Sequence, residues 1–209
     1  MLDINEHPEN SRYEDELRSR KAIQARIRRN RHSGLNFEEE MFINSSRYLI
    51  LHITVNYQRK YQNKMKINTI QDHRDLFLRQ IKEYPNALLQ MVRGIIWKLE
   101  EGDRSGLHLH LLIFYSAQRK SDVMVAQEIG EHWVNEVTHG RGDYWNTNAN
   151  KKKLNRWGVG IGQVNRLDNL KRESLQAFIA NYMAKANQIP RDRTEDDKLF
   201  GMRVFDRLR

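Results

Sequence analysis

The pattern of hydrophobic and polar positions changes at about residue 47. Upstream, the segment Leu17–Arg31 has few apolar residues among its polar ones, which predicts a solvent-exposed helix, or an arm that folds on a partner. Downstream, runs rich in β-branched and aromatic residues alternate with segments of helical spacing. We place the boundary near Ser45, which divides a basic helical extension, residues 1–46, from a domain of residues 47–209.

Five segments of the second part have the composition of strands, namely residues 48–57, 88–99, 107–115, 144–147 and 159–164. Three segments have helical spacing: Asp72–Tyr84, which Pro85 ends; Ser121–Val137, with Ser121 as N-cap; and Leu170–Ala186. Several consecutive strands are close enough in sequence to pair antiparallel, and residues 100–106 are typical of a hairpin connection. The fold class is therefore predicted as α+β, with a central antiparallel sheet flanked by helices.

Composition and charge favour some classes of function for this chain and exclude others. The chain has 36 Lys and Arg against 27 Asp and Glu, and residues 48–185 alone hold 21 basic and 13 acidic residues. Such a surface attracts polyanions, most commonly nucleic acid, although a basic solvated face with no partner stays possible. Cysteine is absent, which excludes disulfides, thiolate metal sites and a cysteine nucleophile. With apolar runs of only about ten residues and an acidic start, we expect a soluble cytosolic protein without membrane contact.

The most specific local feature is the pair His108 and His110 in the strand of residues 107–115. Residues two apart in a strand point to the same face, so the two imidazoles form half of a divalent-metal site. A carboxylate must complete it, and Glu100 and Glu101 are the nearest in sequence. The alternative is a pair of half-exposed histidines without a ligand.

A second feature lies on the last predicted helix. Its apolar stripe packs on the sheet and consists of Leu175, Phe178, Ile179 and Tyr182. Lys185 follows Tyr182 on the same face, where a cation would favour phenolate and stabilise charge on a phosphate. The alternative is a core tyrosine with a lysine that reaches solvent at the helix end.

With these features the chain resembles the HUH endonuclease superfamily, in which a bulky hydrophobic residue separates two metal-binding histidines. Within that superfamily it is most similar to the inovirus-type replication proteins. Three motifs carry the resemblance in the right order over residues 48–185: Ile53-Thr54-Val55-Asn56, His108-Leu109-His110, and Tyr182 with Lys185. The resemblance implies a ferredoxin- or RRM-like sheet.

It also implies an activity. Such enzymes nick single-stranded DNA at an origin hairpin, form a 5′-phosphotyrosine link, and leave a 3′-OH that primes rolling-circle replication of a phage or plasmid. Tyr182 would be the nucleophile, Lys185 would contact the phosphate, and His108, His110 and Glu100 would hold Mg²⁺ or Mn²⁺. The expected partners are the DNA, a helicase and a polymerase in a bacterial host cytoplasm. The expected nucleic-acid contacts are Thr54, Asn56, Lys151, Lys152 and Lys153.

Two other interpretations stay open. A transposase or plasmid relaxase would use the same chemistry, but relaxases commonly carry a third histidine, and none lies near His108 and His110 in sequence. A non-catalytic, RRM-like module would instead stack bases on aromatic residues of the sheet. The candidates for such stacking are Tyr57, Trp97, Tyr115, Tyr144 and Trp145. Because only Tyr182 lies on the last helix, two alternating adjacent tyrosines are not expected.

Overall fold

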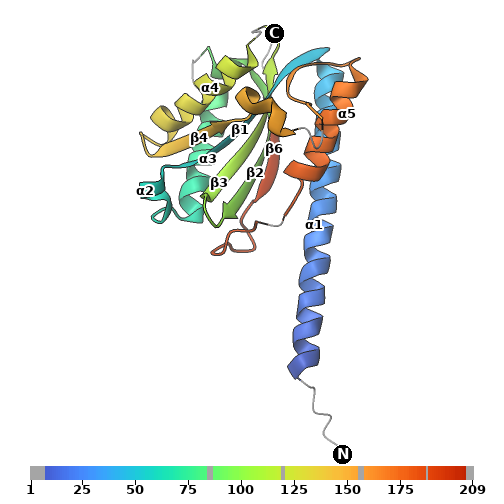
Figure 1. The fold of residues 1–209 in the computed structure, drawn as a ribbon, viewed down its shortest axis with the longest axis vertical. Coiled ribbons are helices and arrows are strands. Elements are labelled where there is room, and N and C mark those ends of the chain that lie inside the picture. Colours follow the sequence, from blue (N-terminus) through green and yellow to red (C-terminus); the bar gives the residue numbers. More distant parts are fainter. Residues whose placement is uncertain (1–7, 84–86, 119–120, 155–157, 187, 206–209) are drawn as a thin grey trace, which may run out of the picture.

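The computed structural model describes residues 8–83, 87–118, 121–154, 158–186 and 188–205, and these form an α+β fold (Figure 1). Its antiparallel sheet has helices on both faces, which confirms the predicted fold class. The described strands are β1 (Arg47–Tyr57), β2 (Val92–Gly102), β3 (Gly106–Ser116), β4 (Gly142–Asn146), β5 (Gly162–Asn165) and β6 (Phe200–Val204).

The strands follow the order β4-β1-β3-β2-β6, and β5 pairs with the first residues of β1 beside β4. The long hairpin of β2 and β3 sets Glu100 opposite His108, and the pairing of β1 with β3 sets Thr54 opposite His110. Five strands were predicted, and the sixth, β6, pairs with the outer edge of β2. It is short and contains Gly201, so it lacks the alternating pattern on which the prediction depended.

The predicted helices are present with different ends, and the short α2 was not predicted. They are α1 (Pro8–Asn44), α2 (Arg59–Gln62), α3 (Ile67–Glu83), α4 (Asp122–His132) and α5 (Asn169–Phe178). Short 3-10 segments, η1 (Leu89–Met91) and η3 (Asn148–Leu154), and π-helical segments, η2 (Trp133–Val137) and η4 (Ile179–Met183), complete the described elements. Ser121 caps α4 as predicted, since its side chain accepts a hydrogen bond from the Met124 N–H. The predicted end of α3 at Pro85 lies outside the described residues.

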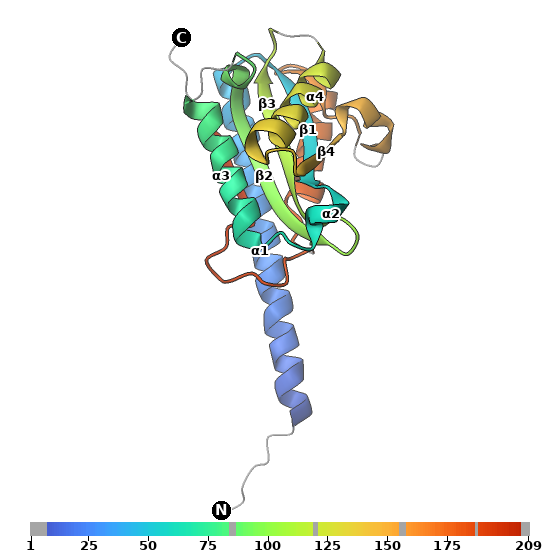
Figure 2. The same cartoon turned by 90° about the vertical axis from the view of Figure 1, so that its left-hand side faces the viewer.

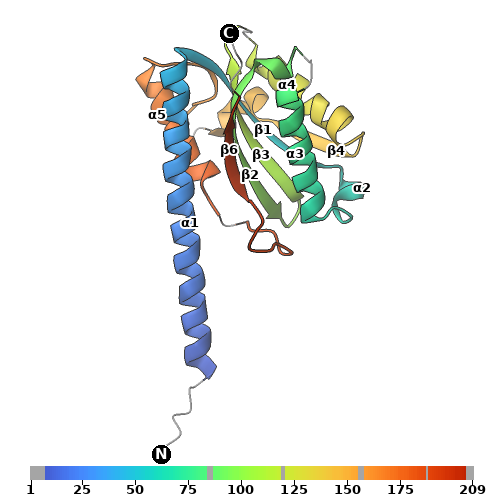
Figure 3. The same ribbon diagram turned by 180° about the vertical axis from the view of Figure 1, so that it is seen from behind.

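Each face of the sheet has its own hydrophobic core. Side chains alternate along β1, so Leu51 and Ile53 face α3 and α4, whereas Ile50 and His52 face α1 and α5. Figure 2 shows α3 and α4 on one side of the sheet, and Figure 3 shows α1 beside α5 on the other. The second core covers only part of its face, and the candidate site occupies the next part of that face.

Helix α1 belongs to the fold at one end only. Near its C-terminus Phe37 and Met41 are buried in the second core, and the fully buried Glu38 receives two 2.9 Å hydrogen bonds from Arg172 of α5. The N-terminal half is exposed and extends away from the rest (Figures 1 and 3). The helix ends next to the boundary predicted at Ser45, and the domain division itself stays a prediction. Within the described part of the chain, no helix is both long and apolar enough to cross a membrane.

Candidate metal centre and neighbouring tyrosine

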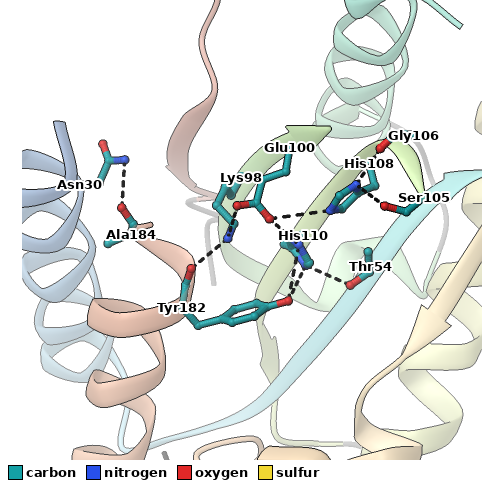
Figure 4. Close-up of polar contacts among 10 residues, drawn as sticks. All are labelled: Asn30, Thr54, Lys98, Glu100, Ser105, Gly106, His108, His110, Tyr182 and Ala184. Atoms are coloured by element: carbon teal, nitrogen blue, oxygen red, sulfur yellow. Dashed lines mark hydrogen bonds and ion pairs between the residues drawn. The ribbon is translucent and has the colours of Figure 1, made fainter. Parts of the chain in front are cut away.

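Glu100 of β2 and His108 and His110 of β3 form a buried group that could hold a metal ion (Figure 4). They share one face of the sheet because His108 and His110 are two residues apart in β3 and Glu100 pairs with His108 across the hairpin. One ligand atom from each lies within 4.8 Å of the others, as a metal-binding group requires. Glu100 is thus the carboxylate of the group, whereas the Glu101 side chain accepts a 2.7 Å hydrogen bond from the backbone N–H of Arg191.

The protonation states of the group suit a cation. Glu100 Oε2 lies 3.0 Å from His110 Nε2 and 3.7 Å from His108 Nε2. Burial disfavours ionisation of Glu100, but the two neighbouring histidines, of which His110 is within hydrogen-bond distance, and the nearby charge of Lys98 outweigh it and lower its pKa below the usual range. Burial lowers the pKa of His110 to about 4, although the bond to Glu100 opposes this. At neutral pH the carboxylate is ionised and the His110 imidazole is neutral, the states in which both bind metals.

Further contacts orient the two imidazoles. His108 Nδ1 lies 2.9 Å from the carbonyl oxygen of Gly106, which can only accept, so Nδ1 carries the proton and the Nε2 lone pair is free for a metal. His110 Nδ1 lies 3.0 Å from Thr54 Oγ1. Because a hydroxyl both donates and accepts, Thr54 fits His110 in either tautomer. Thr54, expected to contact DNA, therefore lies directly behind one imidazole of the group.

Asn56 lies two residues beyond Thr54 on the same face of β1. Its side-chain oxygen is buried and has no hydrogen-bond partner among the described residues. The sequence motif predicted a nucleic-acid contact here, and this oxygen is an acceptor that a ligand could satisfy.

Tyr182 of η4 reaches the same group from the neighbouring layer. Its hydroxyl lies 3.3 Å from His110 Nδ1 and 3.5 Å from Nε2, and its ring stacks on Phe178 with centroids 4.8 Å apart. Burial raises the pKa of the phenol, and the charge of Glu100 raises it further. The structure therefore brings Tyr182 to the histidines as the motif predicted, with the phenol protonated at neutral pH.

Lys98 is a site residue that the sequence reasoning missed. Its Nζ lies 3.0 Å from Glu100 Oε1, donates a 2.9 Å hydrogen bond to the carbonyl of Tyr182, and lies 4.6 Å from the centre of the Tyr182 ring (Figure 4). It is only 3% exposed. Lys98 precedes Glu100 by two residues in β2, so strand alternation was a signal that could have placed it on this face.

Lys185 occupies a different position from the one predicted. The last helix was expected to continue to Ala186, but η4 ends at Met183 with Ala184 as its C-cap. Lys185 thus follows the helix rather than lying one turn beyond Tyr182, and its side chain is exposed. It lines a small cavity together with Glu100 and with Arg26 of α1. One guanidinium nitrogen of Arg26 is buried there and has no hydrogen-bond partner within the described chain.

A third histidine, far away in sequence, lies beside the group. The ring of His52 in β1 stacks on that of His110 with centroids 5.6 Å apart and an angle of 12° between planes. Its Nδ1 lies 2.9 Å from Thr147 Oγ1, while its buried Nε2 has no partner among the residues described. It is not one of the three residues of the ligand group. Alternation along β1 from Thr54 could have identified it.

The predicted lysine cluster is not brought to the metal-binding group by any contact found among the described residues. Lys151 Nζ lies 2.7 Å from Asp122 Oδ2 at the start of α4. Lys152 is exposed on η3, and the side chain of Lys153 lies outside the described residues. Their role in DNA binding stays a prediction.

The chemistry of the donor set fits a divalent cation. Two imidazole nitrogens and one carboxylate suit several ions, and three protein ligands leave coordination positions for oxygen atoms of water or substrate. A phenol, a buried ammonium group and a buried guanidinium nitrogen adjoin this group. Comparisons of the chain with protein-family models, with curated proteins and with solved structures found no match.

Proposed function

We propose that this chain is a metal-dependent HUH endonuclease that nicks and rejoins single-stranded DNA through a covalent link to Tyr182 and so initiates rolling-circle replication. The observation that carries the proposal is the 3.3 Å approach of the Tyr182 hydroxyl to His110, a member of the buried His-His-Glu group. The resemblance of the three sequence motifs to inovirus-type replication proteins supports the same activity.

The chemistry is a transesterification at phosphorus. A Mg²⁺ or Mn²⁺ ion held by Glu100, His108 and His110 would supply polarisation of the phosphate oxygens. The Tyr182 oxygen attacks phosphorus and forms the Tyr–phosphate bond while the bond from phosphorus to the 3′ oxygen breaks. The phenol proton passes to solvent, and the departing 3′ oxygen takes up a proton to become the free 3′-OH. Attack of a 3′-OH on the phosphotyrosine reverses the step and rejoins the strand.

Cationic side chains of the site have separate tasks in this mechanism. Lys98 stabilises negative charge that develops on the Tyr182 oxygen, which matters because burial disfavours the phenolate. Lys185 and Arg26 line the adjoining cavity, where they bind phosphates of neighbouring nucleotides. The partly buried Asn56 and the exposed Lys152 are the remaining strand contacts in the proposal. A host helicase and a host polymerase would extend the freed end.

One observation supports the relaxase alternative and another opposes it. His52 provides the third histidine that the sequence alone did not place near the motif. However, its Nε2 is outside the group of ligand atoms formed by Glu100, His108 and His110. The three-ligand HUH enzyme therefore describes the site better.

The non-catalytic RRM-like alternative requires aromatic rings on an open sheet face. Most of the candidates are unsuitable because they are packed in the interior: Tyr57, Trp97 and Tyr115 are at most 5% exposed. Trp145 is 46% exposed, but it lies on β4 at the edge of the sheet. The described surface thus offers little stacking platform.

Covalent capture tests the proposal directly. Single-stranded oligonucleotides that tile the hairpins in the DNA adjoining the gene are labelled at the 3′ end and incubated with protein and Mn²⁺. Because the fragment downstream of the nick carries the label and its 5′ end joins Tyr182, the protein itself becomes labelled on a denaturing gel. Tyr182→Phe should give no adduct, whereas the matched control Tyr61→Phe, at a half-buried tyrosine away from the group, should give the wild-type yield.

A second variant separates chemistry from binding. His108→Ala should abolish the adduct while much of the DNA binding remains, since the ligand is lost but the basic surface is kept. No adduct from the wild-type protein, or equal yields from wild type and Tyr182→Phe, would contradict the catalytic proposal.

A further inference from the structure

Apart from Arg26, the N-terminal half of α1 is a surface that the proposed nuclease chemistry does not use. Its segment Leu17–Arg31 holds seven basic residues and no acidic one. The helix projects past the sheet and the other helices, and nothing lies beside its first turns in any of the three views (Figures 1, 2 and 3). Two of the apolar side chains near its start are open to solvent, with Tyr13 69% and Leu17 39% exposed.

The cations of this segment surround the helix axis. With about 100° of rotation per residue, residues seven or eleven apart lie on nearly the same side. Three pairs therefore mark three sides, namely Arg18 with Arg29, Lys21 with Arg28, and Arg20 with Arg31, while Arg26 lies on a fourth, toward the metal centre. A polyanion that approaches from one side only would leave most of these charges unused.

Repulsion between basic side chains destabilises the isolated helix, and a bound polyanion would remove this repulsion. Like charges three residues apart repel on a helix surface, and this occurs at Arg18 and Lys21, Arg26 and Arg29, and Arg28 and Arg31. Among the described side chains, two ion pairs are found along this part of the helix, Glu14 with Arg18 and Glu16 with Arg20, both highly exposed. Bound phosphates would replace the missing counter-charges.

Double-helical nucleic acid fits this geometry. Its major groove is about 12 Å wide and admits an α-helix about 10–12 Å across, with phosphates along both walls. A helix that lies in the groove therefore needs cations on several sides. We propose that Leu17–Arg31 binds duplex DNA through the phosphate backbone, independently of sequence, as a second nucleic-acid site.

The duplex site has a fixed relation to Tyr182. Asn30 Nδ2 lies 3.5 Å from the carbonyl of Ala184, and Arg31 Nε donates a 3.3 Å hydrogen bond to the carbonyl of Ala180. Both acceptors belong to the segment that carries the tyrosine or follow it directly. A duplex on α1 is thereby held next to the site proposed for the single strand, as at the base of a hairpin.

Matched double variants test the proposal. Lys21→Gln with Arg28→Gln removes two exposed charges from α1, and Arg79→Gln with Lys82→Gln removes two exposed charges from α3 across the sheet. Binding to a fluorescent duplex of arbitrary sequence is measured by anisotropy over a series of KCl concentrations. At ~0.1 M salt the α1 variant should bind at least about tenfold more weakly, and its logarithmic salt slope should fall by up to ~2, because each lost phosphate contact contributes ~0.9. The α3 variant should retain wild-type affinity.

Further control measurements establish whether a loss of binding is due to the charges of α1. Circular dichroism verifies that the helix content is unchanged, and a photo-crosslinking amino acid at the exposed Ala22 should capture duplex DNA, whereas one at Arg79 should not. Adduct formation on single-stranded substrate should be unchanged in the α1 variant, so failure of the nuclease proposal would leave this test readable. Unchanged duplex affinity and slope, or an equal loss for duplex and for single strands of the same length, would overturn the duplex assignment.

Discussion

Replacing Lys98 by methionine removes the cationic partner of a buried carboxylate. Lys98 is 3% exposed, and its ammonium group lies 3.0 Å from Glu100 Oε1 and donates a 2.9 Å hydrogen bond to the carbonyl of Tyr182. Methionine has a similar length and no charge, so the packing is largely kept. The variant therefore isolates the charge and its two hydrogen bonds.

The expected loss is large without metal. Deleting one partner of a buried ion pair costs ~3–5 kcal/mol because the other charge stays buried. Glu100 keeps its 3.0 Å bond to His110, so we expect the lower end, about 3 kcal/mol of unfolding free energy. For a chain of this size that corresponds to a fall in Tm of roughly 6–12 °C.

Metal should reverse part of this loss. In the wild type the Lys98 charge competes with a cation for Glu100, whereas in the variant the cation replaces the missing charge. The stabilisation by Mn²⁺ should therefore be greater in Lys98→Met than in the wild type. Urea unfolding in chelator and in Mn²⁺ measures both quantities.

Two controls complete this experiment. Lys98→Met combined with Glu100→Gln should recover most of the metal-free stability and lose the response to Mn²⁺, while Lys82→Met at an exposed position should change neither. Unchanged metal-free stability of Lys98→Met, or a response to Mn²⁺ no larger than that of the wild type, would refute the reasoning.

Three further predictions concern the supports of the site. Thr54→Val should weaken Mn²⁺ binding by about 10–100-fold in calorimetry, because the hydrogen bond behind a metal-binding imidazole is lost, and Thr54→Ser should retain most of it. Arg172→Met should lower the unfolding free energy by ~3–5 kcal/mol because Glu38 stays fully buried, and pairing it with Glu38→Gln should restore much of the loss. Burial lowers the pKa of His110 to about 4 from the ordinary 6.5, so as pH falls through this range the unfolded chain takes up a proton that the folded chain does not. Metal-free stability should thus decrease between about pH 6.5 and 4, and less steeply in His110→Gln; equal slopes in the two proteins would contradict it.

Strand alternation predicted the central part of the site. A period of two placed His108 and His110 on one face, and the hairpin between the two long strands brought Glu100 opposite His108. The same rule, applied two residues back from Glu100 and Thr54, would have added Lys98 and His52. Alternation alone places these residues on the face, but their contacts with Tyr182 and His110 depend on neighbouring strands and on the helix layer, which no single-strand pattern records.

Other features depend on structure that short patterns do not record. The position of Lys185 depends on where the π-helical turn of η4 ends, and helical spacing in the sequence does not record that end. Strand β6 forms because the outer edge of β2 accepts a partner, and Gly201 lets it approach Trp97 closely. The fold class was predictable from element order, whereas these details required the assembled sheet.

Because α1 is a single continuous helix, its length sets how far its N-terminal end lies from the metal-binding group. From Asn30, which contacts the segment that follows Tyr182, back to Pro8, the helix spans about 33 Å at 1.5 Å per residue. One turn of duplex DNA is about 34–36 Å long. The far end of α1 therefore reaches less than one duplex turn from the proposed nick, so the length of the helix sets an upper limit on the length of protected DNA. Shortening it by whole turns should shorten the nuclease footprint.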